Sequence, residues 1–187
     1  MIEGELVRDI FLIIHILGAM LGIGSATIAD YLHLKSLKNH RLERTLLGIY
    51  PLLSGLIIAG LLVLVASGFI LVWMKPELLQ SSLFRLKMFL VLVLMVNGYF
   101  LRTYVYPHFK KDVLHNHPKE DARSLMYSSS ITGSISIVSW YTIFILASTK
   151  SYGYSVSSVL NVYITAIILV FLVSIFLEKR SHWNKLK

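Results

Sequence analysis

Long apolar stretches alternate with short polar segments along the whole chain. Each stretch approaches the ~20 residues that a helix needs to cross the hydrocarbon core of a bilayer. Uniformly apolar runs of this length fit spanning helices better than barrel strands, which need only about ten alternating residues. The pattern therefore predicts an all-α integral membrane protein, a five-helix transmembrane bundle with helices at about residues 10–34, 48–74, 83–106, 125–149 and 156–177.

Two prolines help to set the expected limits of the middle helices. Pro51 lies near the start of the second apolar stretch, where a first helical turn tolerates proline. Pro107 is expected to end the third helix, because proline cannot continue the backbone hydrogen-bond ladder. The longest polar stretch, residues 107–123, is too short to fold alone, so residues 1–187 form a single transmembrane domain in this interpretation.

The first expected helix carries a row of small residues with a histidine near each end. At about 100° per residue, one face collects His15, Gly18, Gly22, Ala26, Ala29 and His33. Small residues let helices approach closely in lipid, so the row predicts a tightly packed seam. The same row could instead form a slot for a flat ligand or a metal held by imidazole, since ionisable residues inside a membrane are functional candidates.

The two histidines of this helix cannot share one ligand. His15 and His33 lie roughly 27 Å apart along a straight helix, at 1.5 Å of rise per residue. If both bind a metal or a haem, the chain has two sites, one near each side of the membrane. His15 is the stronger candidate, because it lies well inside the apolar stretch and needs a partner there.

Other ionisable residues gather near the two boundaries of the expected bundle. His33, Asp30 and His108 are expected at one depth, where they could bind a metal or haem or simply face interfacial water. At the opposite boundary the third helix opens with Arg85 and Lys87. These two side chains could extend to the lipid head groups, or they could reach an anion such as a haem propionate.

The fourth expected helix is unusually rich in hydroxyl side chains. One face carries Ser129, Thr132, Ser136 and Ser139. Such side chains can bond the carbonyls of their own helix, so the row need not line a pore. It should still face the interior of the bundle rather than lipid.

Composition narrows the possible functions. The chain is 56% hydrophobic and only 15% charged, which excludes an ordinary soluble domain. Cysteine is absent, which excludes disulfides, thiolate catalysis, cysteine-ligated metal clusters and covalently attached haem. The net charge is +8, but the basic residues do not alternate with aromatic ones as on a nucleic-acid surface, so no nucleic-acid partner is expected.

The positive charges predict how the chain lies in the membrane. Twelve of the 18 Lys and Arg residues fall on the side that carries the C-terminus. The positive-inside rule therefore places the N-terminus outside and the C-terminus in the cytoplasm, with anionic lipids as partners at the cytoplasmic face. The expected location is the bacterial inner (plasma) membrane, which the chain crosses several times.

Two short motifs suggest a family. The opening helix, with His15, Gly24 and His33, resembles that of HemJ-type protoporphyrinogen oxidases, of CopD-type membrane domains of copper-resistance proteins and of their small integral-membrane relatives. Phe84-Arg85-Leu86-Lys87-Met88 is similar to the aromatic-x-x-Lys opening of a later helix in those proteins. The resemblance covers about residues 10–106. It implies that His15 is a haem or metal ligand and that Lys87 lies near an anionic group.

Two hypotheses of function follow. The first is a small membrane protein that binds haem b or a porphyrin and could take part in redox chemistry. Its candidate cofactor-binding residues are His15, Lys87, Arg85, His33 and His108, and the three histidines among them are also the candidate metal ligands. The second is a non-catalytic membrane protein that moves a small solute, or that is a subunit of a homo-oligomer or of a larger membrane complex. Whether the protein is an enzyme stays open.

Overall fold

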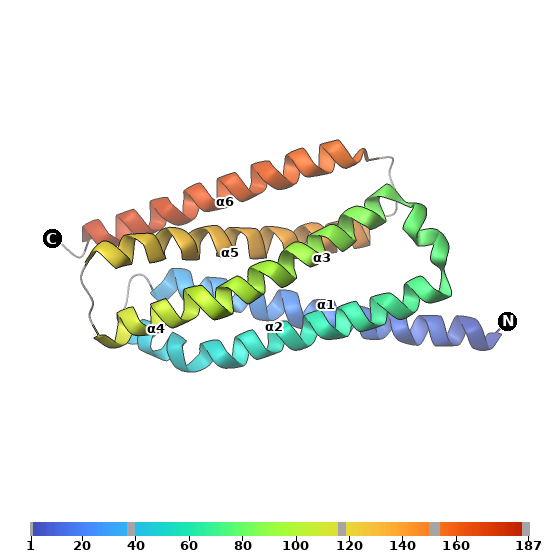
Figure 1. The fold of residues 1–187 in the computed structure, drawn as a ribbon, viewed down its shortest axis with the longest axis horizontal. Coiled ribbons are helices and arrows are strands. Elements are labelled where there is room, and N and C mark those ends of the chain that lie inside the picture. Colours follow the sequence, from blue (N-terminus) through green and yellow to red (C-terminus); the bar gives the residue numbers. More distant parts are fainter. Residues whose placement is uncertain (1, 37–39, 116–118, 150–153, 185–187) are drawn as a thin grey trace.

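The computed structural model describes residues 2–36, 40–115, 119–149 and 154–184 (Figure 1). Within these ranges the regular structure is helical and contains no strand. The elements are α1 (Ile2–Ser36), α2 (His40–Met74), the 3₁₀ turn η1 (Pro76–Gln80), α3 (Ser82–Phe100), the π-helical turn η2 (Leu101–Val105), α4 (Tyr106–His115), α5 (Lys119–Ser148) and α6 (Val156–Asn184).

The predicted number of spanning helices is confirmed. In the described part of the chain, five helical segments are long and apolar enough to cross a membrane: Gly4–His33, Leu47–Met74, Ser82–Lys111, Tyr127–Ser148 and Val156–Leu177. The two termini lie at opposite ends of the bundle (Figure 1), and we refer to these as the N-end and the C-end. Many large apolar side chains point outward, among them Leu12, Leu62 and Val162, as expected of helices that lipid surrounds.

Pro51 and Pro107 both lie inside helical segments. Pro51 falls within α2, which begins at His40, rather than in a first turn. The expected end of the third helix at Pro107 is wrong, because the chain continues as helix from α3 through η2 into α4. A proline ring crowds the carbonyl four residues earlier and removes one hydrogen bond. The π turn directly before Pro107 widens the helix there, which is a known way to accommodate such a break.

Three glycines bring α1 and α2 into backbone contact. A Cβ atom added to Gly60 would lie 2.7 Å from the carbonyl oxygen of Gly18 and 2.7 Å from the backbone nitrogen of Gly22. A Cβ atom at Gly18 would lie 2.9 Å from the backbone nitrogen of Leu64. Real side-chain carbons do not approach other atoms so closely, so only glycine fits at this crossing. The tight packing predicted for the small-residue face of α1 is confirmed.

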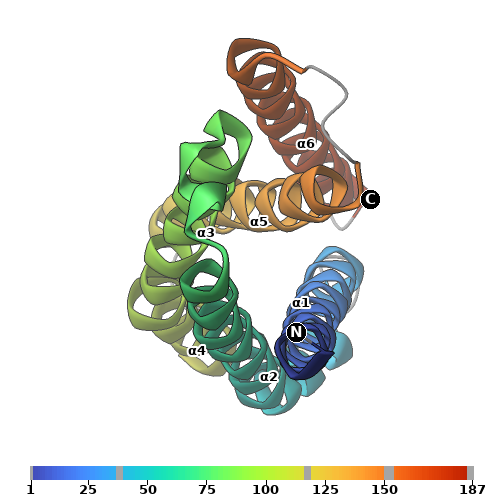
Figure 2. The same cartoon turned by 90° about the vertical axis from the view of Figure 1, so that its right-hand side faces the viewer.

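Helix α5 lies in the middle of the bundle and contacts α1, α3 and α6 (Figure 2). Its Trp140 is 1% exposed and packs against the bare backbone of α1. A Cβ atom at Gly22 would lie 2.7 Å from Cζ2 of this indole. Trp140 belongs to a core cluster that also contains Leu90 of α3 and Tyr163 of α6. The indole of Trp140 therefore packs α1 against the core that α3, α5 and α6 form.

The hydroxyl-rich face of α5 points inward, as predicted. Ser139 is fully buried, and its hydroxyl lies 2.8 Å from the hydroxyl of Tyr163 on α6. Thr132 is also buried, and its carbonyl accepts a hydrogen bond of 3.0 Å from the side-chain amide of Asn97 on α3. These bonds join α5 to its neighbours through polar contacts, which supplement packing where the solvent is itself apolar.

Candidate functional sites

The first candidate site lies near the N-end, where α1 and α2 face each other. The half-buried ring of His15 places Nδ1 3.0 Å from the hydroxyl oxygen of Ser67. That hydroxyl donates its hydrogen to the carbonyl of Val63 at 2.5 Å. Because a serine hydroxyl has one hydrogen, Ser67 must accept from the ring, and Nδ1 is the protonated nitrogen. Nε2 of His15 therefore keeps its lone pair.

The residue after Ser67 also shapes this site. A Cβ atom at Gly68 would lie 3.1 Å from Cε1 of His15, so the imidazole packs against bare backbone of α2. Ser67 orients the ring by a hydrogen bond, and Gly68, which has no side chain, leaves the space that the ring occupies. Neither residue was among the sequence-based candidates. An adjacent Ser-Gly pair in an otherwise apolar helix was the available signal.

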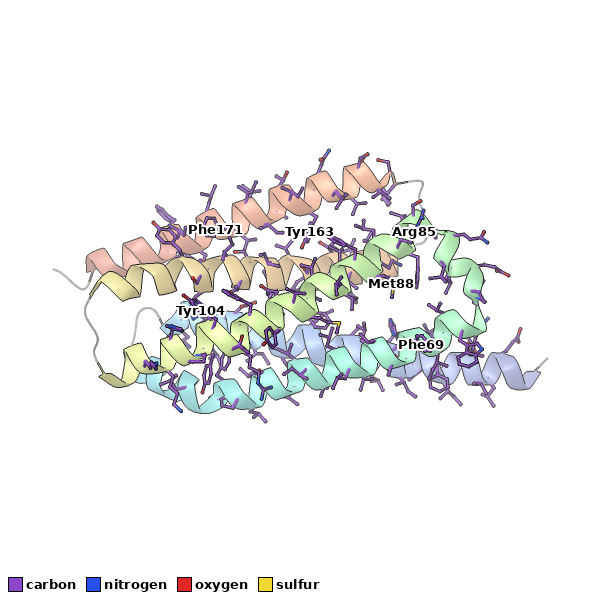
Figure 3. All side chains as sticks on the ribbon, in the orientation of Figure 1. Phe69, Arg85, Met88, Tyr104, Tyr163 and Phe171 are labelled. Atoms are coloured by element: carbon purple, nitrogen blue, oxygen red, sulfur yellow. The ribbon has the colours of Figure 1, made fainter. Side chains whose placement is uncertain are left out.

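Of the two basic residues that open α3, Lys87 is the one that the fold brings to His15. Its side chain is half-buried, and its charge is close enough to the imidazole to interact with it electrostatically. In the described part of the chain, Lys87 forms no ion pair with a carboxylate. Arg85 is exposed near the beginning of α3, where its guanidinium donates to the hydroxyl of Ser82 at 3.3 Å (Figure 3). Lys87, which has no carboxylate partner among the described residues, thus lies close enough to the oriented imidazole to interact with it electrostatically.

The second candidate site is a cavity of about 370 Å³ nearer the C-end. Asp30 and His33 of α1 both line it. The Oδ2 atom of Asp30 is buried and has no hydrogen-bond partner among the described residues. Its other carboxylate oxygen faces Gly133 of α5, where a Cβ atom would lie 3.5 Å away. The carboxylate is therefore held inside the bundle, within a helical segment that is long and apolar enough to cross a membrane.

His108 does not join Asp30 and His33. It is exposed, its Nδ1 lies 2.7 Å from the carbonyl oxygen of Tyr104, and its ring stacks at a tilt on Tyr104 with centroids 4.5 Å apart. The neighbouring Phe109 instead lines the cavity and meets His33 edge to face at 6.2 Å. No cluster of three or more histidine, cysteine, aspartate or glutamate side chains with metal-binding geometry occurs in the described residues.

Aromatic and basic side chains close the C-end of the cavity. Tyr50 of α2 and Tyr106 of α4 stack with centroids 4.3 Å apart and planes 6° from parallel. The hydroxyl of Tyr106 donates to the carbonyl of Leu47 at 3.3 Å. Arg102, in the π turn, also lines the cavity and interacts electrostatically with Tyr50. The turn before Pro107 thus supplies one wall of the site.

The chain matches no protein-family model, no curated protein and no solved structure. The resemblance of residues 10–106 to the HemJ and CopD groups therefore stays a prediction.

Proposed function

We propose that the protein binds haem b, or a closely related porphyrin, beside His15 in the bacterial inner membrane. The observation that supports this best is the hydrogen bond from His15 Nδ1 to Ser67, which leaves Nε2 as a lone-pair donor. Histidines that bind metals commonly use one nitrogen for the metal and donate the other N–H to a neighbouring acceptor. An axial histidine is a standard ligand of haem iron. Bound haem would supply a one-electron redox centre within the bilayer.

Lys87 fits the same ligand, because haem carries propionate groups as well as iron. A half-buried ammonium without a carboxylate partner in the described residues would be stabilised by such an anion. Arg85, which is exposed near the beginning of α3, would serve as a second partner for the propionate groups. The described residues thus offer both a nitrogen donor for the metal and a cation for the porphyrin edge.

The direct test is the visible spectrum of the detergent-purified protein after expression with ample haem. We expect a Soret band in the oxidised protein and a sharp α band after reduction with dithionite. Apoprotein titrated with hemin should give the same bands at a one-to-one ratio. A protein that purifies colourless and takes up no hemin would exclude haem binding.

Replacement of Lys87 should weaken haem binding without changing the bands. Lys87→Ala removes a peripheral charge and leaves the His15 ring in place, so we expect hemin affinity to fall about tenfold. Lys87→Arg retains the charge and is the matched control, with affinity near that of the wild type. Altered band positions in Lys87→Ala would mean that this side chain acts on the iron itself.

We propose that the N-terminus faces the outside and the C-terminus the cytoplasm, on the basis of the Lys and Arg asymmetry. Because the chain has no native cysteine, single cysteines can report on orientation without background. Asn39→Cys and His117→Cys should resist an impermeant maleimide in intact cells, whereas Gln80→Cys and Tyr152→Cys should react. The opposite labelling pattern would reverse the proposed orientation.

A second candidate function is that of a membrane protein that binds or moves a small solute without chemistry. The cavity of about 370 Å³ favours it, since this cavity is lined by Asp30 and His33 and not by His15. A colourless protein that binds a ligand in this cavity would support this function in place of haem binding.

A further inference from the structure

We propose that the cavity between α2 and α3 binds a lipid-soluble molecule with a hydrogen-bond-donating polar end, as long-chain primary amines and alcohols have. The polar end would lie at Asp30, and the apolar chain would lie between the two helices. This inference concerns a site apart from His15 and does not depend on haem.

The carboxylate of Asp30 determines the chemistry of the polar end. An ionised carboxylate only accepts hydrogen bonds, and a buried acceptor without a donor is energetically unfavourable. Among the described residues, Oδ2 of Asp30 is buried without a hydrogen-bond partner, and this side chain lines the cavity. A ligand that brings an ammonium or a hydroxyl to this oxygen would supply the missing donor. A ligand with only acceptor groups would not.

The body of the cavity is apolar. Its walls in α2 include Ile57, Leu61 and Val65, and its wall in α3 includes Leu94 and Met95. Its volume, about 370 Å³, falls in the range of roughly 300–1,000 Å³ that is usual for small-molecule sites. A site with one acceptor at its end and aliphatic walls along its length fits an amphipathic chain.

The cavity opens sideways, toward lipid. Leu62 of α2 is 63% exposed and Tyr99 of α3 is 73% exposed, although both line it. These residues therefore form a rim between the two helices. The helices diverge from the α4 end toward η1 (Figures 1 and 2). A molecule dissolved in the bilayer could reach the cavity past this rim without crossing water.

Trp140 offers a direct probe of occupancy, because it also lines the cavity. Gly22, which the indole contacts, precedes Asp30 by eight residues, about 12 Å along α1. A chain anchored at Asp30 and running toward Trp140 would bring its far end to the indole. Trp73→Phe and Trp183→Phe leave Trp140 as the sole tryptophan among the three in the chain.

The experiment uses this variant, full-length, in nanodiscs of phosphatidylcholine. The probes are undecyl chains with a terminal bromine, which quenches tryptophan at contact, and with an amine, an alcohol or a carboxylic acid at the other end. We expect saturable quenching by the amine and the alcohol and none by the acid in its ionised form, which has no hydrogen to donate. Asp30→Asn should raise the dissociation constant of the amine about tenfold, because a charge-assisted hydrogen bond is lost.

A second variant tests the place of binding. Gly98 lines the cavity, and a Cβ atom there would meet nothing within 4 Å, so Gly98→Leu should fill the space without disturbing the fold. It should abolish saturable quenching. Gly24→Leu, at an exposed position equally open, is the matched control and should leave quenching unchanged. Saturable quenching by the acid alone, as expected of an anion site at Arg102, would overturn the proposal, as would quenching that persists in Gly98→Leu.

Discussion

Gly60→Ala is expected to lower the free energy of unfolding by about 3 kcal/mol, at the upper end of the usual penalty for overpacking. The added Cβ atom would lie 2.7 Å from the Gly18 carbonyl oxygen and 2.7 Å from the Gly22 backbone nitrogen. These are backbone atoms and cannot rotate away, so α1 and α2 must move apart. The midpoint of thermal unfolding in detergent, followed by circular dichroism, should fall by roughly 10 °C.

The matched control for this change is Gly55→Ala on the same helix. A Cβ atom at Gly55 would meet nothing within 4 Å, and alanine favours helix over glycine by about 1 kcal/mol. We therefore expect Gly55→Ala to leave the midpoint unchanged or to raise it slightly. Equal destabilisation by the two substitutions would show that the α1–α2 crossing is not as close as described.

The second large effect is expected at His15. His15→Ala should abolish the haem absorption bands, because it removes the nitrogen donor proposed for the iron. His33→Ala should remove at most a second spectral component, and His108→Ala should have no effect, since its ring lies outside the cavity on Tyr104. The measurement is the haem content per protein, together with the reduced spectrum, at equal protein concentration. Haem retained in full by His15→Ala would place the ligand elsewhere.

Ser67→Ala tests whether the His15 ring must be oriented. The substitution removes the acceptor of the 3.0 Å contact with Nδ1, and loss of such a supporting partner typically weakens metal affinity by about 10–100-fold. Ser148→Ala is the matched control, because that exposed hydroxyl donates to a carbonyl of its own helix, at Phe144. A general effect of serine removal would appear in both variants; an effect on haem binding should appear in Ser67→Ala alone.

Hydrophobic periodicity was sufficient to predict the helical fold and the face of α1 that packs. Five apolar stretches of spanning length leave few alternatives to a helical bundle. The row from Gly18 to Ala29 predicts close packing, because residues three to four apart share a helix face. Helix limits were less predictable. A proline ends a helix when the neighbouring turn cannot widen. The π turn η2 is the wider turn in this chain, and the helix continues through Pro107.

The partners of each residue could not be predicted, because they depend on which helices become neighbours. Nothing in the sequence places Gly60 opposite Gly22, or Ser67 opposite His15. The depth argument correctly put Asp30 and His33 near one end of the bundle, and both line the cavity. The same argument grouped them with His108, which the helical rotation after η2 turns away from that cavity. Equal depth in the membrane is therefore a weaker criterion for grouping residues into one site than a shared helix face.

The contact between Trp140 and Gly22 has a consequence for biosynthesis. The α1–α2 hairpin has its own glycine crossing and can associate in the bilayer as soon as its second helix is released from the ribosome. The surface of Gly22 that receives the indole then stays uncovered until α5 is inserted. This part of the interface between α1 and α5 therefore forms only after α5 has been inserted. Substitution of Trp140 by a smaller residue should leave the α1–α2 hairpin intact but the newly made protein only partly assembled. Such a species should be degraded by the proteases that remove misassembled membrane proteins.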